Sequence, residues 1–271
     1  MRHLVVASLT AAGLSVGLTA AASAADVGRP APVYTKAPVP VPFSWTGFYI
    51  GANAGGHWSK DDHSAFVSEN NNFTAASVAH LNADAPVSLS PTGFAGGVHA
   101  GYNWQWSSLV LGVEGDFDGL TGSKTRTLSD PFLGAANPTV FVDSAQDRWM
   151  ATARARAGFA VDRALFYATG GAAWSNWSIS HSFSLPAPPS INGTDNSTFT
   201  RTGWTAGGGF EYAFTNNWLA RVEYLYADFG AVDGTLATKL VFPPFVFVTN
   251  FAERDRLTEQ VVRAGISYKF R

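Results

Sequence analysis

Two alternating runs of residues meet at a short polar turn between Gly203 and Phe229. Alternate residues of both runs are aromatic, aliphatic or small: Trp204, Ala206, Gly208, Phe210, Tyr212 and Phe214 before the turn, and Trp218, Ala220, Val222, Tyr224 and Tyr226 after it. Because successive side chains of a strand point to opposite faces of a sheet, each run presents one apolar face. A soluble sheet buries such a face, whereas a transmembrane barrel turns it toward lipid and places aromatic residues at both interfaces. The aromatic residues at both ends of the runs predict a transmembrane hairpin.

The composition favours an all-β chain. Of the 271 residues, 14% are charged, 14% are aromatic and 27 are glycine. After residue 25, no apolar run approaches the roughly 20 residues that a membrane helix needs. High aromatic and glycine content without such runs indicates strands. The formal net charge of −2 provides no basic surface, so we expect no nucleic-acid binding.

The N-terminal residues have the pattern of a secretory signal peptide. Met1-Arg2-His3 is basic, an apolar stretch follows, and Ala22-Ser23-Ala24 is a cleavage motif, so we expect residues 1–24 to be removed. Residues 25–44 are rich in proline, which keeps a chain extended, and we interpret them as a periplasmic linker. The chain has no cysteine, which excludes disulfides, thiol catalysis and cysteine metal sites. Residues 45–271 form the predicted barrel.

Three tight connections divide this barrel region: Ser107-Ser108, Asp162-Arg163 and Thr215-Asn216-Asn217. They recur at roughly 50 to 55 residues, the spacing of a hairpin plus a long loop. We therefore predict eight strands: Gly47–Trp58, Thr92–Trp106, Leu109–Leu120, Asp147–Val161, Ala164–Ser178, the two runs on either side of Thr215-Asn216-Asn217, and Leu257–Phe270. Four polar segments should be long outer loops: Ser59–Pro91, Thr121–Gln146, Ile179–Thr200 and Ala231–Arg256. Short periplasmic turns and long outer loops are typical of an eight-stranded antiparallel up-and-down transmembrane β-barrel.

The outward aromatic residues of these strands fall into two rings. One predicted ring contains Trp58, Phe94, Phe117, Trp149, Trp174, Trp204 and Tyr226. The other contains Trp104, Trp106, Phe159, Phe166, Tyr212, Phe214, Trp218, Tyr268 and Phe270. Nearly every strand contributes to both rings, as expected where a barrel crosses the two interfaces of a membrane.

Charged residues occupy the opposite, inward phase of the predicted strands. They are Glu114, Asp116, Glu211 and Glu223, and Arg154, Arg156, Arg221, Arg263 and Lys269. The interior of an eight-stranded barrel is just wide enough to be filled by side chains. Because an unpaired charge in that space would be costly, we expect these residues to form an ion-pair network that plugs the lumen. The alternative is that the same charges line a pore or gate.

Several motifs resemble those of one protein family. They are the proline-rich segment Pro30–Pro38, then Phe43–Gly51, Gly112–Asp116, Tyr167–Ala172, Arg221–Tyr226 and the terminal Gly265–Phe270. Together they are similar to the outer-membrane immunogenic (porin-like) β-barrel proteins of alphaproteobacteria, relatives of the OmpA-type eight-stranded membrane domain. The resemblance covers nearly the whole mature chain.

The resemblance implies a place in the cell outer membrane, surface-exposed loops and a structural role in the envelope. The partners that it implies are outer-membrane lipid, lipopolysaccharide and the barrel-insertion machinery. Some family members bind haemin and many are described as porins, so a narrow porin and a surface ligand-binding protein are alternative functions. Family members usually end on the aromatic residue that the insertion machinery reads. Here Arg271 follows Phe270, but Tyr268 and Phe270 keep the alternating signal, and we expect insertion to proceed.

Candidate chemistry in the sequence is weak. An enzyme would need a nucleophile within reach of a base. His57, His99, Ser59 and Ser90 offer both groups, but no third group is marked, and we expect no catalytic site.

Haem iron could instead be ligated by loop histidines with aromatic neighbours, for which His63, His80 and His181 are weak candidates. Asp116-Phe117-Asp118-Gly119 lacks the remaining ligands of a calcium loop. We therefore expect no metal and no resident cofactor.

Overall fold

The computed structural model describes residues 42–67, 75, 79, 82–83, 87–130, 138–185, 191–242 and 245–270. The chain divides into two units, Met1–Val41 and Pro42–Arg271. The predicted signal peptide and most of the predicted linker lie outside the described residues, as do His80 and Arg271. Within the described part, no helix is long and apolar enough to cross a membrane.

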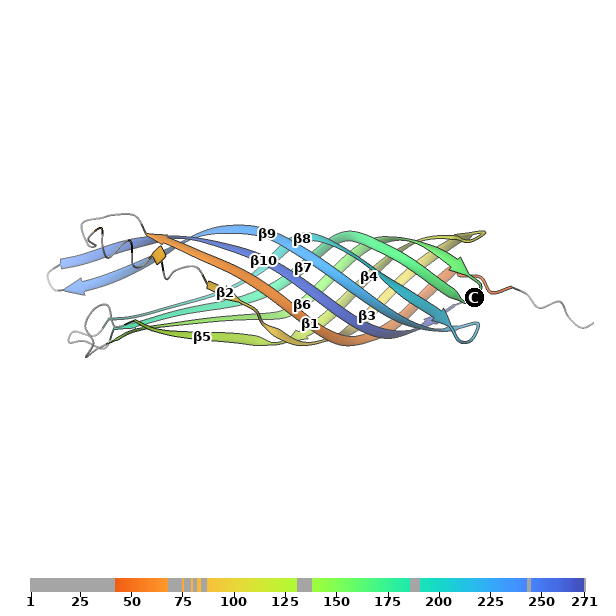
Figure 1. Ribbon diagram of the computed structural model, residues 1–271, viewed down its shortest axis with the longest axis horizontal. Coiled ribbons are helices and arrows are strands. Elements are labelled where there is room, and N and C mark those ends of the chain that lie inside the picture. The colour runs from red at the N-terminus through yellow and green to blue at the C-terminus, as the bar shows by residue number, and fades with distance from the viewer. Residues whose placement is uncertain are drawn as a thin grey trace, which may run out of the picture. The chain divides into compact units, whose positions relative to one another are not determined.

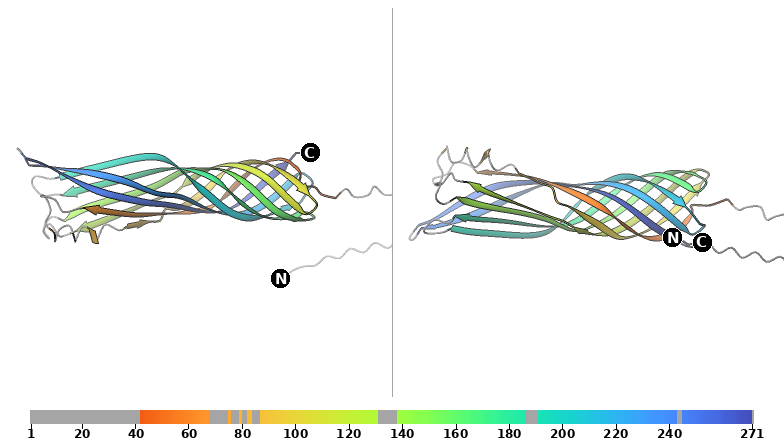
Figure 2. Two further views of the ribbon diagram at one scale, coloured as in Figure 1. Left: turned by 90° about the horizontal axis from the view of Figure 1, so that it is seen from above. Right: turned by 60° about the horizontal axis from the view of Figure 1, so that its bottom comes forward.

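Antiparallel strands account for most of the second unit (Figure 1). The ten strands of the described residues are β1 (Gly47–Val67), β2 (Val87–Leu89), β3 (Thr92–Trp106), β4 (Leu109–Thr121), β5 (Ser123–Asp130), β6 (Thr139–Val161), β7 (Ala164–Leu185), β8 (Ile191–Ala213), β9 (Trp218–Phe242) and β10 (Phe245–Lys269). The strands pair in the order β10-β9-β8-β7-β6-β4-β3-β1, and β10 also pairs with β1. The sheet therefore closes into a barrel of tilted strands, as the views in Figure 2 show.

The predicted strands lie within the strands of this ring, apart from the terminal residues Phe214 and Phe270. The short strands β2 and β5 were not predicted; they pair with β1 and β6 beyond the ring. The all-β antiparallel barrel is thus confirmed; of the ten described strands, eight follow one another around the closed ring, and β2 and β5 are additional to it.

The three tight connections lie where the sequence placed them, at the end of the barrel that we call the turn end. Ser107 and Asp162 each have a positive φ, of 55° and 50°, which lets two residues reverse the chain between paired strands. In the third turn, the Thr215 hydroxyl accepts hydrogen bonds from the amides of Asn217 and Trp218, at 3.2 and 2.9 Å.

The opposite end, which we call the outer end, differs from the prediction. The described residues of the segments expected to be four long loops are mostly strand: β1 continues to Val67, β7 and β8 extend to Leu185 and Ile191, and β9 and β10 extend to Phe242 and Phe245. Ser, Thr and Asn lie on the face of the β7–β8 extension that continues the outward phase, as the pairs Ser178–Thr198, Ser180–Asn196 and Ser182–Thr194 show. The apolar outward face of a membrane strand is therefore missing there, although paired backbones still form a ladder. The correction is that the sheet continues beyond the outer aromatic ring.

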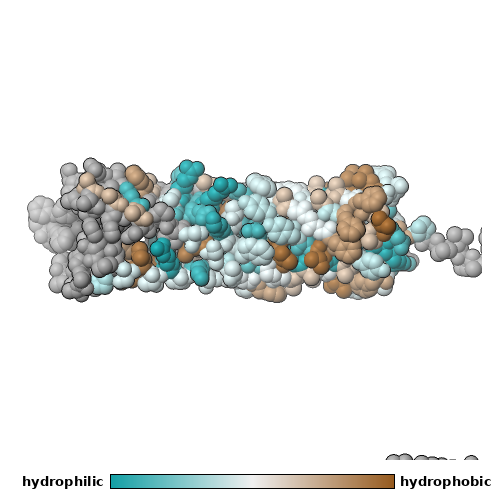
Figure 3. Space-filling view, in the orientation of Figure 1, coloured by the Kyte–Doolittle hydropathy of each residue, from teal (hydrophilic) through white to brown (hydrophobic). Residues whose placement is uncertain are grey.

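The outward face of the barrel carries the apolar belt. Phe94, Phe117 and Trp204 of the outer ring are more than half exposed, and so are Trp106, Phe159 and Phe166 of the ring near the turn end. Neighbouring strands bring ring members together: the Trp204 and Tyr226 ring centroids are 5.6 Å apart. Figure 3 shows apolar residues gathered toward the turn end and hydrophilic ones toward the outer end. We take the strand segments between the two rings as membrane-spanning.

Candidate functional site in the barrel lumen

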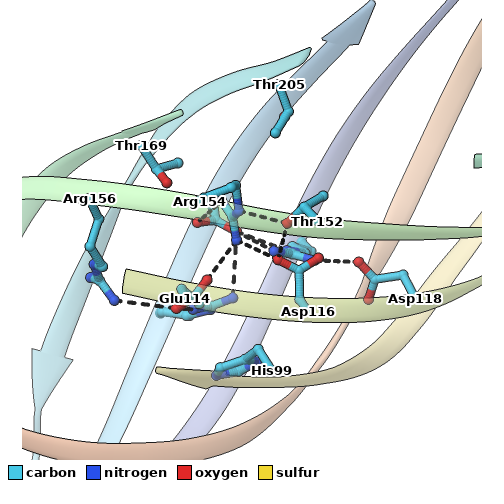
Figure 4. A network of polar contacts seen from close by, with 12 residues as sticks. His99, Glu114, Asp116, Asp118, Thr152, Arg154, Arg156, Thr169 and Thr205 are labelled. Atoms are coloured by element: carbon cyan, nitrogen blue, oxygen red, sulfur yellow. Dashed lines mark hydrogen bonds and ion pairs between the residues drawn. The ribbon is translucent and has the colours of Figure 1, made fainter. Parts of the chain in front are cut away.

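One ionic network fills the middle of the lumen (Figure 4). Four arginines and five carboxylates take part: Arg154, Arg156, Arg221 and Arg263 with Glu114, Asp116, Asp118, Glu211 and Glu223. These side chains come from β4, β6, β8, β9 and β10, so the network joins strands on different sides of the barrel. All of them are buried.

Arg154 lies at the centre of this network. Its Nη2 atom lies 2.6 Å from Glu114 Oε1 and 2.7 Å from Asp116 Oδ2, and its Nη1 atom lies 3.0 Å from Glu223 Oε1. Its Nε donates to the Thr152 hydroxyl at 2.9 Å. Every nitrogen of the guanidinium therefore has an acceptor, which is the condition under which a buried charge is tolerated.

Two tyrosines reach across the lumen into the same network. The Tyr49 hydroxyl donates to Glu114 Oε2 at 2.7 Å and accepts from Arg156 Nη1 at 2.8 Å. The Tyr167 hydroxyl donates to Glu223 Oε1 at 2.9 Å. Each ring lies against a glycine where a Cβ would clash, since a Cβ on Gly101 would be 2.4 Å from Tyr49 Oη and one on Gly209 would be 2.7 Å from Tyr167 Oη. These glycines make room for the rings.

Apolar side chains lie on both sides of the network. Toward the turn end a cluster contains Trp45, Val110, Ala160, Leu165, Tyr167, Ala213 and Leu219, with Phe43 packed against it. Toward the outer end another contains Ala95, Leu120, Met150, Ala173, Trp177, Leu225, Ala227, Phe229, Leu257 and Val261. The lumen therefore has an ionic middle layer between two apolar layers.

Trp45 closes the turn end of the lumen. Its position just before the first strand did not predict this role. The Trp45 side chain is fully buried; its indole nitrogen donates to the Asp162 carbonyl at 3.2 Å, and its amide donates to Gln105 Oε1 at 2.6 Å. The last residues of the predicted linker belong to this end, because Phe43 packs edge-on against Trp45.

Lys269 is the predicted network member that the structure places elsewhere. Its Nζ donates to the Ser44 carbonyl at 2.6 Å and lies 5.0 Å from the centre of the Phe43 ring. The residue follows the inward phase of β10 but lies one layer below the acids, where the chain enters the barrel. Asp118 takes part in the network instead, through Arg263. The sequence could have shown this, because Asp118 shares the inward face of β4 with Glu114 and Asp116.

A second polar cluster lies above the ionic network, around His57. The Nδ1 atom of His57 lies 3.3 Å from Asp147 Oδ2 and 3.4 Å from Glu259 Oε1. Ser59 also donates to Asp147, so His57 and Ser59 share one acid. Sequence reasoning missed Asp147 because a bulge between Asp147 and Trp149 reverses the inward phase of β6. His99, the other inward histidine, lies 2.7 Å from the Ser267 hydroxyl.

The haemin candidates His63 and His181 come together in the strand extensions of β1 and β7. Their ring centroids are 5.4 Å apart. His63 pairs with Asp255, and the Nδ1 atom of His181 lies 2.9 Å from Asp143 Oδ1. Burial raises the pKa of neighbouring Asp61 to about 7; Asp255 adds to this rise, and His63 and His181 oppose it. His80 lies outside the described residues.

A family model for the outer membrane protein β-barrel domain matches residues 10–270. The chain belongs to this outer-membrane barrel family. It is 36% identical over 278 residues to the 31 kDa outer-membrane immunogenic protein of Brucella melitensis, with 100% of both chains covered. It is 29% identical over 271 residues to the 25 kDa outer-membrane immunogenic protein of Brucella abortus, covering 100% of this chain and 99% of that one.

Solved structures of outer-membrane proteins also align with this outer-membrane barrel. The protease OmpT from Escherichia coli aligns with a TM-score of 0.45 at 9% identity, over 85% of this chain and 99% of OmpT. Neisserial surface protein A aligns with a TM-score of 0.35 at 18% identity, over 83% of this chain and 98% of that one. The family and the Brucella relatives give the barrel its location, the cell outer membrane.

Proposed function

We propose that this protein is a structural barrel of the outer membrane, whose lumen is closed by its own side chains and whose extended sheet is presented at the cell surface. The ionic network carries this proposal, because it joins strands around the barrel and leaves its carboxylates paired with arginine. A ring of strands tied together across its own axis gains mechanical and thermal stability, which suits a role in envelope integrity.

The same geometry argues against the porin alternative. A continuous water path would have to pass the Trp45 layer, the ionic layer and the outer apolar layer in turn. Porins that keep an aqueous channel have about 16 to 18 strands, whereas small barrels fill their interior. A solute channel through this lumen would need all three layers to rearrange.

Single-channel recording tests the proposal directly. The mature chain, refolded and inserted into a planar bilayer, should give no reproducible conductance steps, while insertion is verified by protease protection and by the heat-dependent gel migration of folded barrels. Conductance steps whose ion selectivity changes in Arg154→Met or Glu223→Gln would contradict the proposal and identify a pore.

The partners follow from the outward surface. We propose that lipid covers the apolar belt between the two aromatic rings, with lipopolysaccharide at the outer ring, and that the barrel-insertion machinery reads Tyr268 and Phe270. Both aromatic side chains are exposed on the lipid-facing phase, and the Phe270 amide donates to the Phe48 carbonyl at 2.8 Å, which holds the C-terminal end in the sheet.

Haemin binding at the outer end is a second candidate function, favoured by the proximity of His63 and His181. Titration of haemin into the refolded barrel, followed by the Soret absorbance, should show weaker binding in His63→Ala and in His181→Ala. Equal binding in both variants would remove these two histidines as iron ligands.

A further inference from the structure

A histidine and two carboxylates from three different strands meet in the lumen above the ionic network. They are His57 of β1, Asp147 of β6 and Glu259 of β10, and each is at most 2% exposed. One ligand atom from each lies within 4.8 Å of the other two. None of these three residues belongs to the predicted ion-pair network or to the haemin candidates, so this cluster is separate from both sites.

The hydrogen bonding of His57 directs a lone pair toward the acids. Its Nε2 atom lies 3.1 Å from the Thr121 carbonyl oxygen, and because a carbonyl can only accept, Nε2 carries the hydrogen. In a neutral ring the other nitrogen, Nδ1, is then an acceptor. That atom faces Asp147 Oδ2 and Glu259 Oε1, which are acceptors as well. Three acceptors turned toward one another repel unless a proton or a cation lies between them.

Of the four carboxylate oxygens in this cluster, only Asp147 Oδ2 accepts a hydrogen bond from a described residue, Ser59. Both oxygens of Glu259 and the Oδ1 atom of Asp147 are buried without a hydrogen-bond partner among the described residues. No ion pair of the described residues joins either acid to Lys or Arg. The ionic network one layer below has an arginine for nearly every acid, so the shortage of positive charge is local to this cluster.

The two separations from His57 Nδ1 fit a tetrahedral ion. Zinc bonds of about 2.1 Å to nitrogen and oxygen place neighbouring ligands about 3.4 Å apart at a tetrahedral angle. The observed separations from His57 Nδ1 are 3.3 Å to Asp147 and 3.4 Å to Glu259. The hydrogen bond from Nε2 to a backbone carbonyl is the contact that usually orients a metal-bound histidine.

We propose that His57, Asp147 and Glu259 bind one divalent cation of the zinc class in the lumen. Two carboxylates and a neutral imidazole carry two negative charges, which such an ion neutralises. Three protein ligands leave a fourth position for water, and Ser59, which donates to Asp147, holds that carboxylate in place. Because the ligands come from β1, β6 and β10, the ion would tie together strands on different sides of the barrel. Since the site is enclosed, the ion would enter as the barrel closes during folding.

Metal analysis of the refolded barrel tests this site. The mature chain is refolded in detergent with Zn²⁺, dialysed against metal-free buffer and analysed by mass spectrometry for metal content. We expect about one zinc per chain, and in a Co²⁺ preparation the visible absorption bands of a tetrahedral site. Glu259→Gln and Asp147→Asn should each lose at least ten-fold in zinc retained, while Glu211→Gln, a matched change in the ionic network, should retain it.

Gel migration before and after boiling identifies the folded protein used in every comparison. If either Glu259→Gln or Asp147→Asn fails to fold, the comparison uses the variant that does fold. Folded wild-type protein with far less than stoichiometric zinc and no cobalt bands would overturn the proposal, and would indicate an imidazolium at His57 shared by the two acids. Zinc retained equally by wild type, Glu259→Gln and Asp147→Asn would overturn it too, by placing the ion elsewhere.

Discussion

Replacing Arg154 by methionine tests whether the lumen network stabilises the barrel. Arg154 contacts three acids, Glu114, Asp116 and Glu223, and its side chain has no solvent exposure. Methionine keeps much of the side-chain volume, so the change removes charge and hydrogen bonds more than it removes packing.

The expected loss follows from the contacts that remain. Each of the three acids keeps another arginine, since Arg221 and Arg263 both contact Glu223, Arg263 contacts Asp116, and Arg221 contacts Glu114. No acid is left without a partner, but a network that already has one carboxylate more than it has arginines gains a second uncompensated negative charge. Removing one partner of a buried ion pair costs about 3 to 5 kcal/mol, and we expect Arg154→Met to fall in that range.

Urea unfolding of the barrel in detergent micelles, followed by tryptophan fluorescence, measures this cost. Arg148→Met is the matched control, because Arg148 belongs to the same strand and its side chain is exposed. The control should change the free energy of unfolding by less than about 1 kcal/mol. An Arg154→Met barrel within about 1 kcal/mol of wild type would refute the ion-pair plug.

A double variant separates charge balance from lost contacts. Adding Glu223→Gln to Arg154→Met returns the network to its original charge difference between acids and arginines. The double variant should therefore be more stable than the sum of the single changes predicts, by about 0.5 to 3 kcal/mol. Additive losses would mean that the two side chains act independently, contrary to the 3.0 Å contact between them.

Three further predictions concern the ends of the barrel. Trp45→Ala should lower the free energy of unfolding by about 3 to 5 kcal/mol, measured as above, because it empties the turn-end layer; an unchanged midpoint would mean that the layer collapses without cost. For Asp61, whose pKa is raised from 3.8 to about 7, the folded state holds the proton more tightly, so its contribution to stability is present below about pH 4 and is lost as the pH rises through 7. Asp61→Asn should therefore flatten the fall in thermal midpoint between pH 4 and pH 8, and an equally steep fall would exclude Asp61 as its source. Phe270→Ser should slow insertion into vesicles that contain the purified insertion machinery and leave insertion into pure lipid nearly unchanged, whereas equal slowing in both would indicate a packing effect.

The barrel and much of its network could be predicted because alternation survives wherever one face meets lipid and the other meets the lumen. The alternation is unbroken along β4 and along β9 as far as Ala227, so it alone places Glu114, Asp116, Arg221 and Glu223 inward, where the structure has them. The two-residue turns could be predicted as well, because a polar pair between two runs of alternating apolar residues is the pattern of a tight β-hairpin.

The alternation of inward and outward residues misleads where strand pairing is irregular or where the outward face is polar. The bulge on β6 shifts the phase by one residue, which turns Asp147 inward and conceals the His57 cluster. In the extensions of β7 and β8, the outward face carries Ser, Thr and Asn where a membrane strand carries apolar residues, so the sequence predicts loops there. Tyr49 and Tyr167 were missed for another reason: their side chains fit over Gly101 and Gly209, their register partners on the neighbouring strands, a relation that no single strand reveals.

The distribution of polar and apolar residues explains why the lumen, rather than the surface, determines stability here. In a soluble protein, burial of the apolar face supplies the main driving force for folding, but the apolar face of this barrel meets lipid and gains little from packing within the protein. The interior must then hold the strands together through paired charges, tyrosine hydroxyls and two thin apolar layers. Since each layer contacts several strands, removing a side chain weakens the ring before it opens a path along the axis. A single lumen substitution should therefore lower stability without producing conductance.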